Sequence, residues 1–144
     1  MAAVDVYLSI GTNLGNRRRN IRIALNLLDM AIGTHYSALS SIVESKASGF
    51  TGPDFLDCVV CYRTARSPQT LLQICKRIER QMGRTDAPEY AEDGSRIYHD
   101  RIIDIDILLY GKRKIDTPEL TVPHPRMQDR DFIMGPLKEI FDQK

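Results

Sequence analysis

The chain has 144 residues, with 20 Lys and Arg against 19 Asp and Glu, so its formal net charge is only +1. This balance argues against a large nucleic-acid interface, which needs a strongly basic surface. No apolar run is long enough to span a bilayer, and the first ten residues lack the basic and apolar regions of a signal peptide. The length predicts one domain over residues 1–144, and we expect a cytoplasmic protein that binds neither nucleic acid nor membrane.

The first half of the chain predicts a strand, a helix and two more strands. Val4 to Ile10 is typical of a strand, and the turn that follows carries glycines at positions 11 and 15. The next segment has helical periodicity and ends at Gly33, with its apolar face formed by Ile21, Ala24, Leu25, Leu28 and Ile32. Tyr36 to Ala47 and Phe55 to Thr64 then predict strands, separated by a loop over 48–53.

The second half predicts a helix, a long loop and a further strand. Ser67 is a plausible N-cap before Pro68, and the helix should run to about Met82 and end at Gly83. The polar segment 84–100 is long for a connection within a compact domain, which suggests a functional or mobile loop. The strand over 101–110 follows, then a short strand near 112–115, the segment 120–126 and a short terminal helix.

The element order β-α-β-β-α-β is typical of ferredoxin-like α+β folds. We therefore expect an antiparallel sheet with helices packed on it and extra C-terminal elements. Because unrelated functions share this fold, the site residues must decide the function.

The predicted strand over 101–110 carries two carboxylates in an otherwise apolar run. Side chains alternate along a strand, so Ile103, Ile105, Ile107 and Leu109 should share one face and Asp104 and Asp106 the other. The two acids would repel each other unless a cation lies between them, and divalent ions bound to a phosphate chain fit that need. An exposed face with two solvated acids is the alternative, since antiparallel sheets commonly have one face in contact with water.

Arginines and a histidine surround this strand in the sequence. Arg84 opens the long loop and Arg101 closes it, and the guanidinium group is suited to phosphate oxygens. The stiff Pro-His-Pro sequence around His124, with Arg126 and Arg130 beyond it, could also bind a phosphate chain. Each residue alone has a simpler explanation as a surface ion pair or a rigid turn. Their combination favours phosphoryl transfer.

Taken together, the chain resembles the 6-hydroxymethyl-7,8-dihydropterin pyrophosphokinase family. The resemblance covers nearly the whole chain. It rests on Tyr7-Leu-Ser-Ile-Gly-Thr-Asn-Leu-Gly15, Ser40-Ser41 with Glu44-Ser45, Gly49-Phe-Thr-Gly-Pro-Asp-Phe-Leu56, Ile78-Glu79 with Gly83-Arg84, Arg101 to Gly111, and Thr121 to Met127 followed by Arg130 and Phe132.

The resemblance implies an ATP-dependent diphosphokinase of folate biosynthesis. It would transfer diphosphate from ATP to the hydroxymethyl group of the pterin and release AMP. Asp104 and Asp106 would hold two Mg²⁺ ions with ATP, and Arg84 and Arg101 would be catalytic. The implied ATP-binding residues are Glu79, Arg84, Arg101, His124 and Arg130, and the implied pterin-binding residues are Ser45, Phe55, Asp57 and Phe132. ATP and the pterin would be the only partners of a monomer.

Three positions depart from the family pattern. Asp57 stands where the family has a pterin-contacting asparagine, Tyr98-His-Asp-Arg101 replaces a Trp-Gly-Pro-Arg sequence, and Lys46 replaces a common proline. An ionised carboxylate only accepts hydrogen bonds. Asp57 must therefore meet pterin donors alone, be protonated, or leave one pterin acceptor to water or another group.

Two other functions remain as alternatives from the residues. One is another two-metal nucleotidyltransferase on the same core, which would attack the α-phosphorus and release pyrophosphate. The other is a non-catalytic ligand-binding or RNA-binding module. RNA binding predicts exposed aromatic residues on the central strands and a basic face, and this chain has neither feature in its sequence pattern.

Overall fold

The structure is a computed structural model that describes residues 2–46, 52–84, 89–90, 92–94, 96–97 and 101–143. Its regular elements are, in chain order, β1 (Val4–Thr12), α1 (Arg17–Ile32), β2 (Ala38–Leu39), β3 (Val43–Ser45), β4 (Phe55–Thr64), α2 (Pro68–Gln81), β5 (Glu89–Tyr90), β6 (Arg96–Ile97), β7 (Asp104–Tyr110), β8 (Ile115–Asp116), β9 (Thr121–Val122), a 3₁₀ turn (Met127–Asp129) and α3 (Asp131–Gln143).

The main sheet has the strand order β2-β4-β1-β7, with β3 also paired to β4, and every pairing in it is antiparallel. The α+β class and the antiparallel sheet are confirmed. Because β1 lies between β4 and β7, the end of β1 adjoins the beginnings of both neighbours: Thr12 pairs with Leu56, and Gly11 pairs with Asp104. Residues from β1, β4 and β7 therefore lie close together at this end of the sheet.

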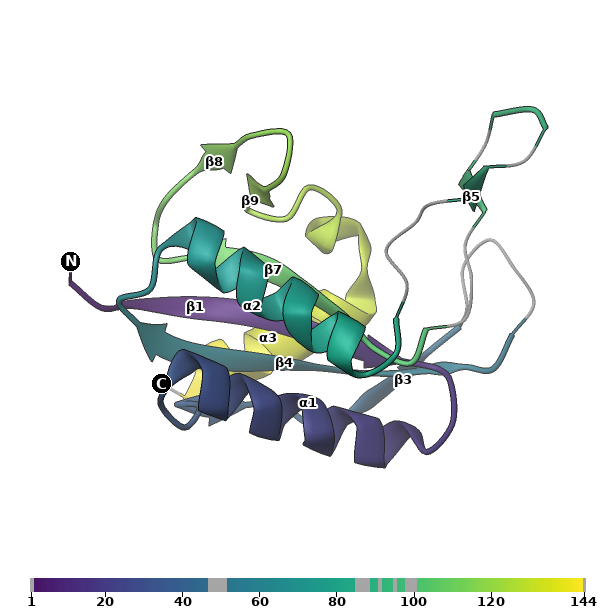
Figure 1. Cartoon of the computed structure of the whole chain (residues 1–144). Coiled ribbons are helices and arrows are strands. Elements are labelled where there is room, and N and C mark those ends of the chain that lie inside the picture. The colour runs from purple at the N-terminus through teal and green to yellow at the C-terminus, as the bar shows by residue number, and fades with distance from the viewer. Residues whose placement is uncertain are drawn as a thin grey trace.

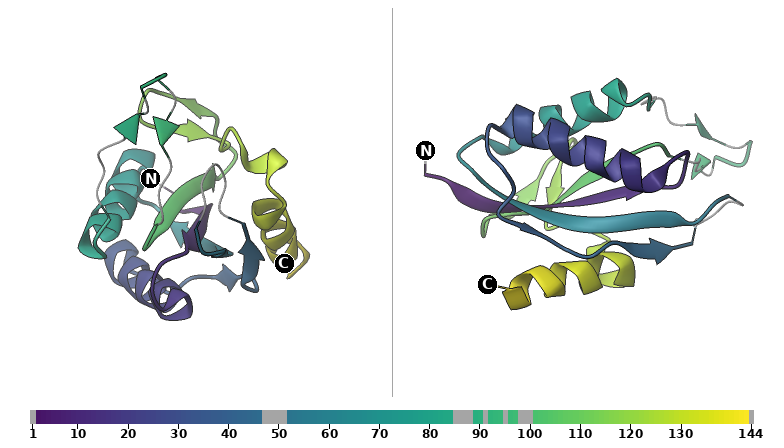
Figure 2. Two further views of the ribbon diagram at one scale, coloured as in Figure 1. Left: turned by 90° about the vertical axis from the view of Figure 1, so that its right-hand side faces the viewer. Right: turned by 90° about the horizontal axis from the view of Figure 1, so that it is seen from below.

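Helices cover both faces of the sheet, with α1 and α2 on one side and α3 on the other (Figures 1 and 2). Alternation along β1 divides the two cores. Val6, Leu8 and Ile10 join the larger core beneath α1 and α2, whereas Tyr7 joins the core beneath α3. The burial of these apolar side chains is the main favourable contribution to folding.

The helix boundaries predicted from local patterns are confirmed. Asn16 caps α1 by accepting a hydrogen bond from the Arg19 backbone N–H, and Gly33 ends the helix with φ of 94°. Ser67 caps α2 in the same way through the Thr70 N–H. A side chain at position 33 would be strained, which explains why glycine ends α1 there.

Three strand predictions are wrong in detail. The strand expected over 36–47 consists of two short strands, β2 and β3, and both pair with β4. The short strand expected near 112–115 begins only at Ile115 as β8, and it pairs with β9, which lies in the segment 120–126. The strand expected over 101–110 is β7, which begins at Asp104 rather than Arg101.

The expected face of Leu109 is also wrong. The register between β1 and β7 shifts between Tyr7 and Leu8, so Leu108 is an extra residue on β7. Ile103, Ile105 and Ile107 lie in the core beneath α1 and α2, but Leu109 packs on the α3 side. A bulge reverses the alternation beyond it, and it leaves the face of Asp104 and Asp106 unchanged because both precede it.

Parts of two predicted loops lie outside the described residues. These parts are 48–51 in the first loop and 85–88, 91, 95 and 98–100 in the second, and residue 47 at the end of the strand expected over 36–47 also lies outside the described residues. Within the second segment, β5 and β6 pair as short antiparallel strands. Among the described residues, no helix is long and apolar enough to cross a membrane.

Candidate active site

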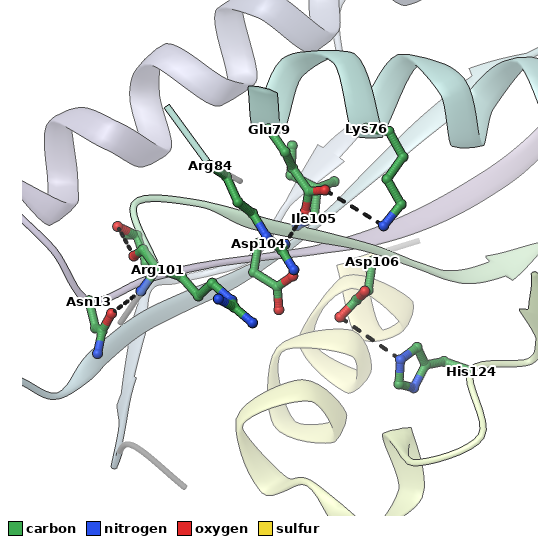
Figure 3. Close-up of polar contacts among 10 residues, drawn as sticks. Asn13, Lys76, Glu79, Arg84, Arg101, Asp104, Ile105, Asp106 and His124 are labelled. Carbon is green, nitrogen blue, oxygen red and sulfur yellow. Dashed lines mark hydrogen bonds and ion pairs between the residues drawn. The ribbon is translucent and has the colours of Figure 1, made fainter. Parts of the chain in front are cut away.

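The acidic pair lies on β7 at the edge of the main sheet (Figure 3). Asp104 and Asp106 share the face opposite the core residues Ile105 and Ile107 and are separated by about 7 Å of strand rise. Their side chains are 38% and 35% exposed, so both carboxylates can reach a ligand. The predicted placement of two acids on one face is confirmed.

Arg84 joins the acidic pair to the end of α2. One nitrogen, Nη1, lies 2.6 Å from Glu79 Oε2 and 2.6 Å from Asp104 Oδ1. Glu79 is only 1% exposed, and the same Oε2 accepts a hydrogen bond from the Ile105 backbone N–H at 2.9 Å. Glu79 therefore fixes both the backbone of the acidic strand and the arginine beside it.

This buried cluster retains unused polar atoms. Among the described residues, Glu79 Oε1 and Arg84 Nε have no hydrogen-bond partner. Burial raises the pKa of Glu79, while the Ile105 N–H and Arg84 act in the opposite direction. The Lys76 Nζ lies 3.9 Å from Glu79 Oε1, which places a second cation near the cluster.

Asp106 lies near two other carboxyl groups, those of Asp104 and Glu79. Burial is the largest cause that raises the pKa of Asp106 to about 7, and the negative charges of Asp104 and Glu79 act in the same direction. Arg84 and Arg130 favour the ionised form. A carboxylate in this position gains from any additional positive charge placed beside it. The electrostatics therefore favour a bound cation.

His124 faces Asp106 from the other side of the edge strand. Its Nε2 lies 3.9 Å from Asp106 Oδ2, and its backbone N–H donates to the Leu108 carbonyl at 3.0 Å. Burial and the nearby Arg130 lower the pKa of His124. Because Nδ1 accepts a hydrogen bond from the Arg126 backbone N–H, the neutral ring carries its proton on Nε2, pointing toward the acidic pair.

A second cluster lies on the same sheet face beyond β1. Asp57 pairs with Gly11 on β1, which in turn pairs with Asp104 on β7. The Ser45 hydroxyl donates to Asp57 Oδ2 at 2.6 Å, and Asp57 is only 6% exposed. Gly11 has no side chain, so the Asp57 carboxylate can lie close against its Cα; a Cβ there would be 2.8 Å from Asp57 Oδ1 and 3.6 Å from Phe55 Cδ1.

Gly11→Ala tests whether this close approach of Asp57 to the Gly11 backbone matters. An added Cβ would lie 2.8 Å from Asp57 Oδ1, so the carboxylate must move. Under the pterin-binding role that the sequence resemblance implies for Asp57, we expect the KM for the pterin to rise by about 10-fold or more, since misplacing a binding group by about 1 Å can cost that much. Gly135→Ala is the control because its added Cβ meets nothing within 4 Å. Equal pterin KM values for both variants would contradict this role of Gly11.

Asp57→Asn tests how much the buried negative charge of Asp57 lowers the stability of the protein. Burial, the largest cause, raises the pKa of Asp57 to about 6, above the value of about 3.9 for an unfolded chain. Ionisation therefore costs stability increasingly as the pH rises from about 4 through 6. Relative to the parent chain, the variant should gain about 1–3 kcal/mol in unfolding free energy between pH 4 and pH 7.

Chemical denaturation at both pH values measures this gain, and an unchanged or smaller difference at pH 7 would contradict it. If Asp57 lies in the pterin site that the sequence resemblance implies, Asp57→Asn should bind the pterin as tightly as the parent chain or more tightly. A large loss of affinity would mean that the carboxylate itself has a specific role in pterin binding.

The remaining predicted site residues surround these two clusters. Phe55 pairs with Ser45 at the beginning of β4, and Phe132 lies on α3 with its ring 5.8 Å from the Arg130 guanidinium carbon. The charge of Arg130 favours the ionised forms of both Asp57 and Asp106, so it lowers the pKa of a carboxyl in each cluster. In Figure 3 the Arg101 side chain points toward Asp104.

The sequence reasoning did not single out Asn13, which is buried at the same end of the sheet. Its side chain accepts a hydrogen bond from the Arg101 backbone N–H at 2.6 Å and donates to the Pro53 carbonyl at 3.0 Å. A polar residue directly after a buried strand was the available signal, but its two partners are 40 and 88 positions away in the chain.

The acidic pair fits magnesium better than a metal held by protein alone. Among the described residues, no group of three His, Cys, Asp or Glu side chains could hold a metal ion. Mg²⁺ commonly binds through one or two carboxylates together with substrate phosphates and water. Two exposed carboxylates on one strand face meet that requirement when a nucleotide supplies the other ligands.

An antiparallel α+β domain with acids, arginines and a histidine gathered at one sheet edge is the arrangement of a phosphate-transferring enzyme. Comparison with known proteins narrows this class. The family model of 7,8-dihydro-6-hydroxymethylpterin-pyrophosphokinase matches residues 7–142. The chain belongs to this family.

Curated relatives agree with this assignment. A 2-amino-4-hydroxy-6-hydroxymethyldihydropteridine pyrophosphokinase of Porphyromonas gingivalis is 42% identical over 94% of this chain and 89% of its own length. The protein of the same name from Bacillus subtilis is 35% identical over 95% of this chain and 78% of its own length. A mitochondrial folate synthesis bifunctional protein of Pisum sativum is 39% identical over 94% of this chain, but the match covers 25% of that relative.

Proposed function

We propose that the chain transfers diphosphate from ATP to the hydroxymethyl group of 6-hydroxymethyl-7,8-dihydropterin, with two Mg²⁺ ions at Asp104 and Asp106. The chain is a pyrophosphokinase of folate biosynthesis. The observation that carries the proposal is the acidic pair on one strand face, with Arg84 and His124 beside it. Asp104, Gly11 and Asp57 are cross-strand neighbours on β7, β1 and β4. A second substrate bound at Asp57 would therefore lie next to a nucleotide bound at Asp104.

In this reaction the pterin hydroxyl oxygen bonds to the β-phosphorus of ATP. The bond between the β-phosphorus and the oxygen bridging to the α-phosphorus breaks, AMP leaves, and the hydroxyl proton is released. When bound, Mg²⁺ neutralises charge on the phosphate oxygens. The protein mainly positions the reactants and stabilises charge, since phosphoryl transfer needs little covalent help.

The nucleotide side consists of Glu79, Arg84, Arg101, His124 and Arg130. Arg84 and Arg101 take up charge on the transferred phosphates, and the Nε2–H of His124 donates to a phosphate oxygen. In the structure Arg84 lies against Asp104. The arginine therefore occupies part of the space where a cation would bind, and a phosphate chain offers it a replacement anion. Glu79 is buried and acts by holding Arg84 and β7.

The pterin side consists of Ser45, Phe55, Asp57 and Phe132. The two aromatic rings hold the bicyclic ring by offset stacking. Asp57, fixed by the Ser45 hydroxyl, meets the hydrogen-bonding edge of the pterin. Gly11 lets the Asp57 carboxylate lie close to β1, since an added Cβ would be 2.8 Å from Asp57 Oδ1.

The proposal extends to the whole chain. Residues 1–144 form one domain, and its sheet order together with the two helices on one face supports a ferredoxin-like core with C-terminal additions. The net charge of +1 supports a protein that does not bind nucleic acid. We place it in the cytoplasm as a monomer that binds ATP and the pterin but no membrane.

A product assay tests the proposed function. Purified protein with Mg²⁺ and ATP should form AMP only when hydroxymethyldihydropterin is present, and chelation of the metal should stop the reaction. Formation of ADP would indicate transfer of a single phosphate. The absence of pterin-dependent turnover would favour a binding module.

A further inference from the structure

Asn13 lies where the two halves of the proposed site meet. It follows directly after β1, whose last residue, Thr12, pairs with the beginning of β4. On the other side of β1, Gly11 pairs with Asp104 at the beginning of β7. The turn after β1 is therefore next to the segments that lead into both neighbouring strands.

The Asn13 side chain bonds to both of these segments. Its Oδ1 accepts from the Arg101 N–H at 2.6 Å, three residues before Asp104 (Figure 3). Its Nδ2 donates to the Pro53 carbonyl at 3.0 Å, two residues before Phe55. The Asn13 backbone N–H adds a third bond, to the Arg101 carbonyl at 2.9 Å.

The environment of Asn13 makes these bonds consequential. The residue is only 1% exposed, so water cannot readily replace a lost partner. One partner requires an acceptor and the other a donor, and the carboxamide is the short side chain that supplies both in one plane. Aspartate would keep the acceptor and lose the donor, and alanine would lose both.

We propose that Asn13 is a positioning residue that holds the nucleotide-side segment at Arg101 and the pterin-side segment at Pro53 in a fixed relation. The inference rests on the proposed function and assigns the coupling of its two substrate sites to one side chain. Asn13 acts through the backbones of its neighbours, so it sets the position of Arg101 and Phe55 without touching either substrate.

Two variants of Asn13 separate the effects of its hydrogen bonds to Arg101 and to Pro53. Asn13→Ala should lower kcat by about 100-fold and raise KM for both substrates, since displacements of about 1 Å at reacting groups have effects of this size. Asn13→Asp keeps the bond to Arg101 and places a second oxygen against the Pro53 carbonyl. It should raise KM for the pterin by about 10-fold or more while KM for ATP stays within about 3-fold, since one unsatisfied buried group costs this much.

Asn20→Ala is the matched control. Asn20 donates to the Leu14 carbonyl at 2.7 Å and to Thr12 Oγ1 at 3.2 Å, so it stabilises the same turn without bonding to Arg101 or Pro53. Steady-state kinetics are measured well below each variant's Tm and normalised to folded protein. Asn20→Ala should lower Tm with kcat and both KM values within about 3-fold of the parent chain.

The inference is overturned if Asn13→Ala and Asn13→Asp match Asn20→Ala in kcat and in both KM values. It is also overturned if Asn13→Asp raises both KM values equally. If Asn13→Ala fails to fold, the KM split of Asn13→Asp decides the matter. Failure of the proposed function is a separate result, because the parent chain itself would then show no pterin-dependent AMP.

Discussion

Asp106→Asn and Asp104→Asn are each expected to lower Mg²⁺-dependent turnover by about 1,000-fold or more. The two carboxylates share one strand face and retain exposures of 35% and 38%, so both are available to metal-bound phosphates. Removing a charged ligand weakens metal binding and leaves charge on the phosphates unneutralised as transfer proceeds. Steady-state kinetics over a range of Mg²⁺ concentrations measures the effect, and excess metal should restore part of the activity.

The loss in Asp106→Asn should not come from unfolding. Asp106 is crowded by Asp104 and Glu79, so replacing its charge with an amide relieves repulsion and should leave Tm equal or higher. Asp116→Asn on β8 is the charge-matched control, with an exposed side chain, and it should retain parental kinetics. Near-normal turnover in both Asp104→Asn and Asp106→Asn would exclude a metal role for the acidic pair.

Arg84→Ala is expected to lower both activity and stability. Its Nη1 is the hydrogen-bonding partner of Glu79 Oε2 and Asp104 Oδ1, and Glu79 is 1% exposed. Removing the arginine leaves a buried carboxylate without its cation, which costs about 3–5 kcal/mol. Loss of the charge beside the phosphates should also lower kcat by about 100-fold or more. Urea denaturation and kinetics measure the two effects separately.

A second substitution separates these effects. Adding Glu79→Gln to Arg84→Ala removes the unpaired buried charge, so most of the lost stability should return while kcat stays low. Full recovery of kcat in the double variant would show that Arg84 acts only by keeping Glu79 neutralised. A stable Arg84→Ala single variant would contradict the structural part of the argument.

Local patterns in the sequence were sufficient for much of this fold. The caps at Asn16 and Ser67 and the glycine at position 33 mark α1 and α2 because capping depends on neighbouring residues. The division of the strand over 36–47 and the bulge at Leu108 depend on pairing with β4 and β1. Pairing across the sheet leaves little local signal in either strand.

The candidate site shows the same contrast. Strand alternation was enough to place Asp104 and Asp106 on one face. The bond from Arg84 to Glu79 and Asp104 joins residues from α2, the segment after it and β7, so no single segment predicts it. Asn13 was missed because its importance comes from two partners far away in the chain.

From the sequence alone, the acidic pair fits either a metal site or a solvated strand face. The structure adds the buried Glu79 and Arg84 on one side and His124 on the other, an arrangement that a simple solvent-exposed strand does not need. The family match then specifies which phosphate chemistry such a cluster serves.

The fate of labelled ATP tests the central claim most directly. With the pterin substrate and Mg²⁺, label from the γ-phosphate of ATP should appear in the pterin product and label from the α-phosphate should remain in AMP. Transfer of the α-label to the pterin with release of pyrophosphate would contradict the account and indicate a nucleotidyltransferase.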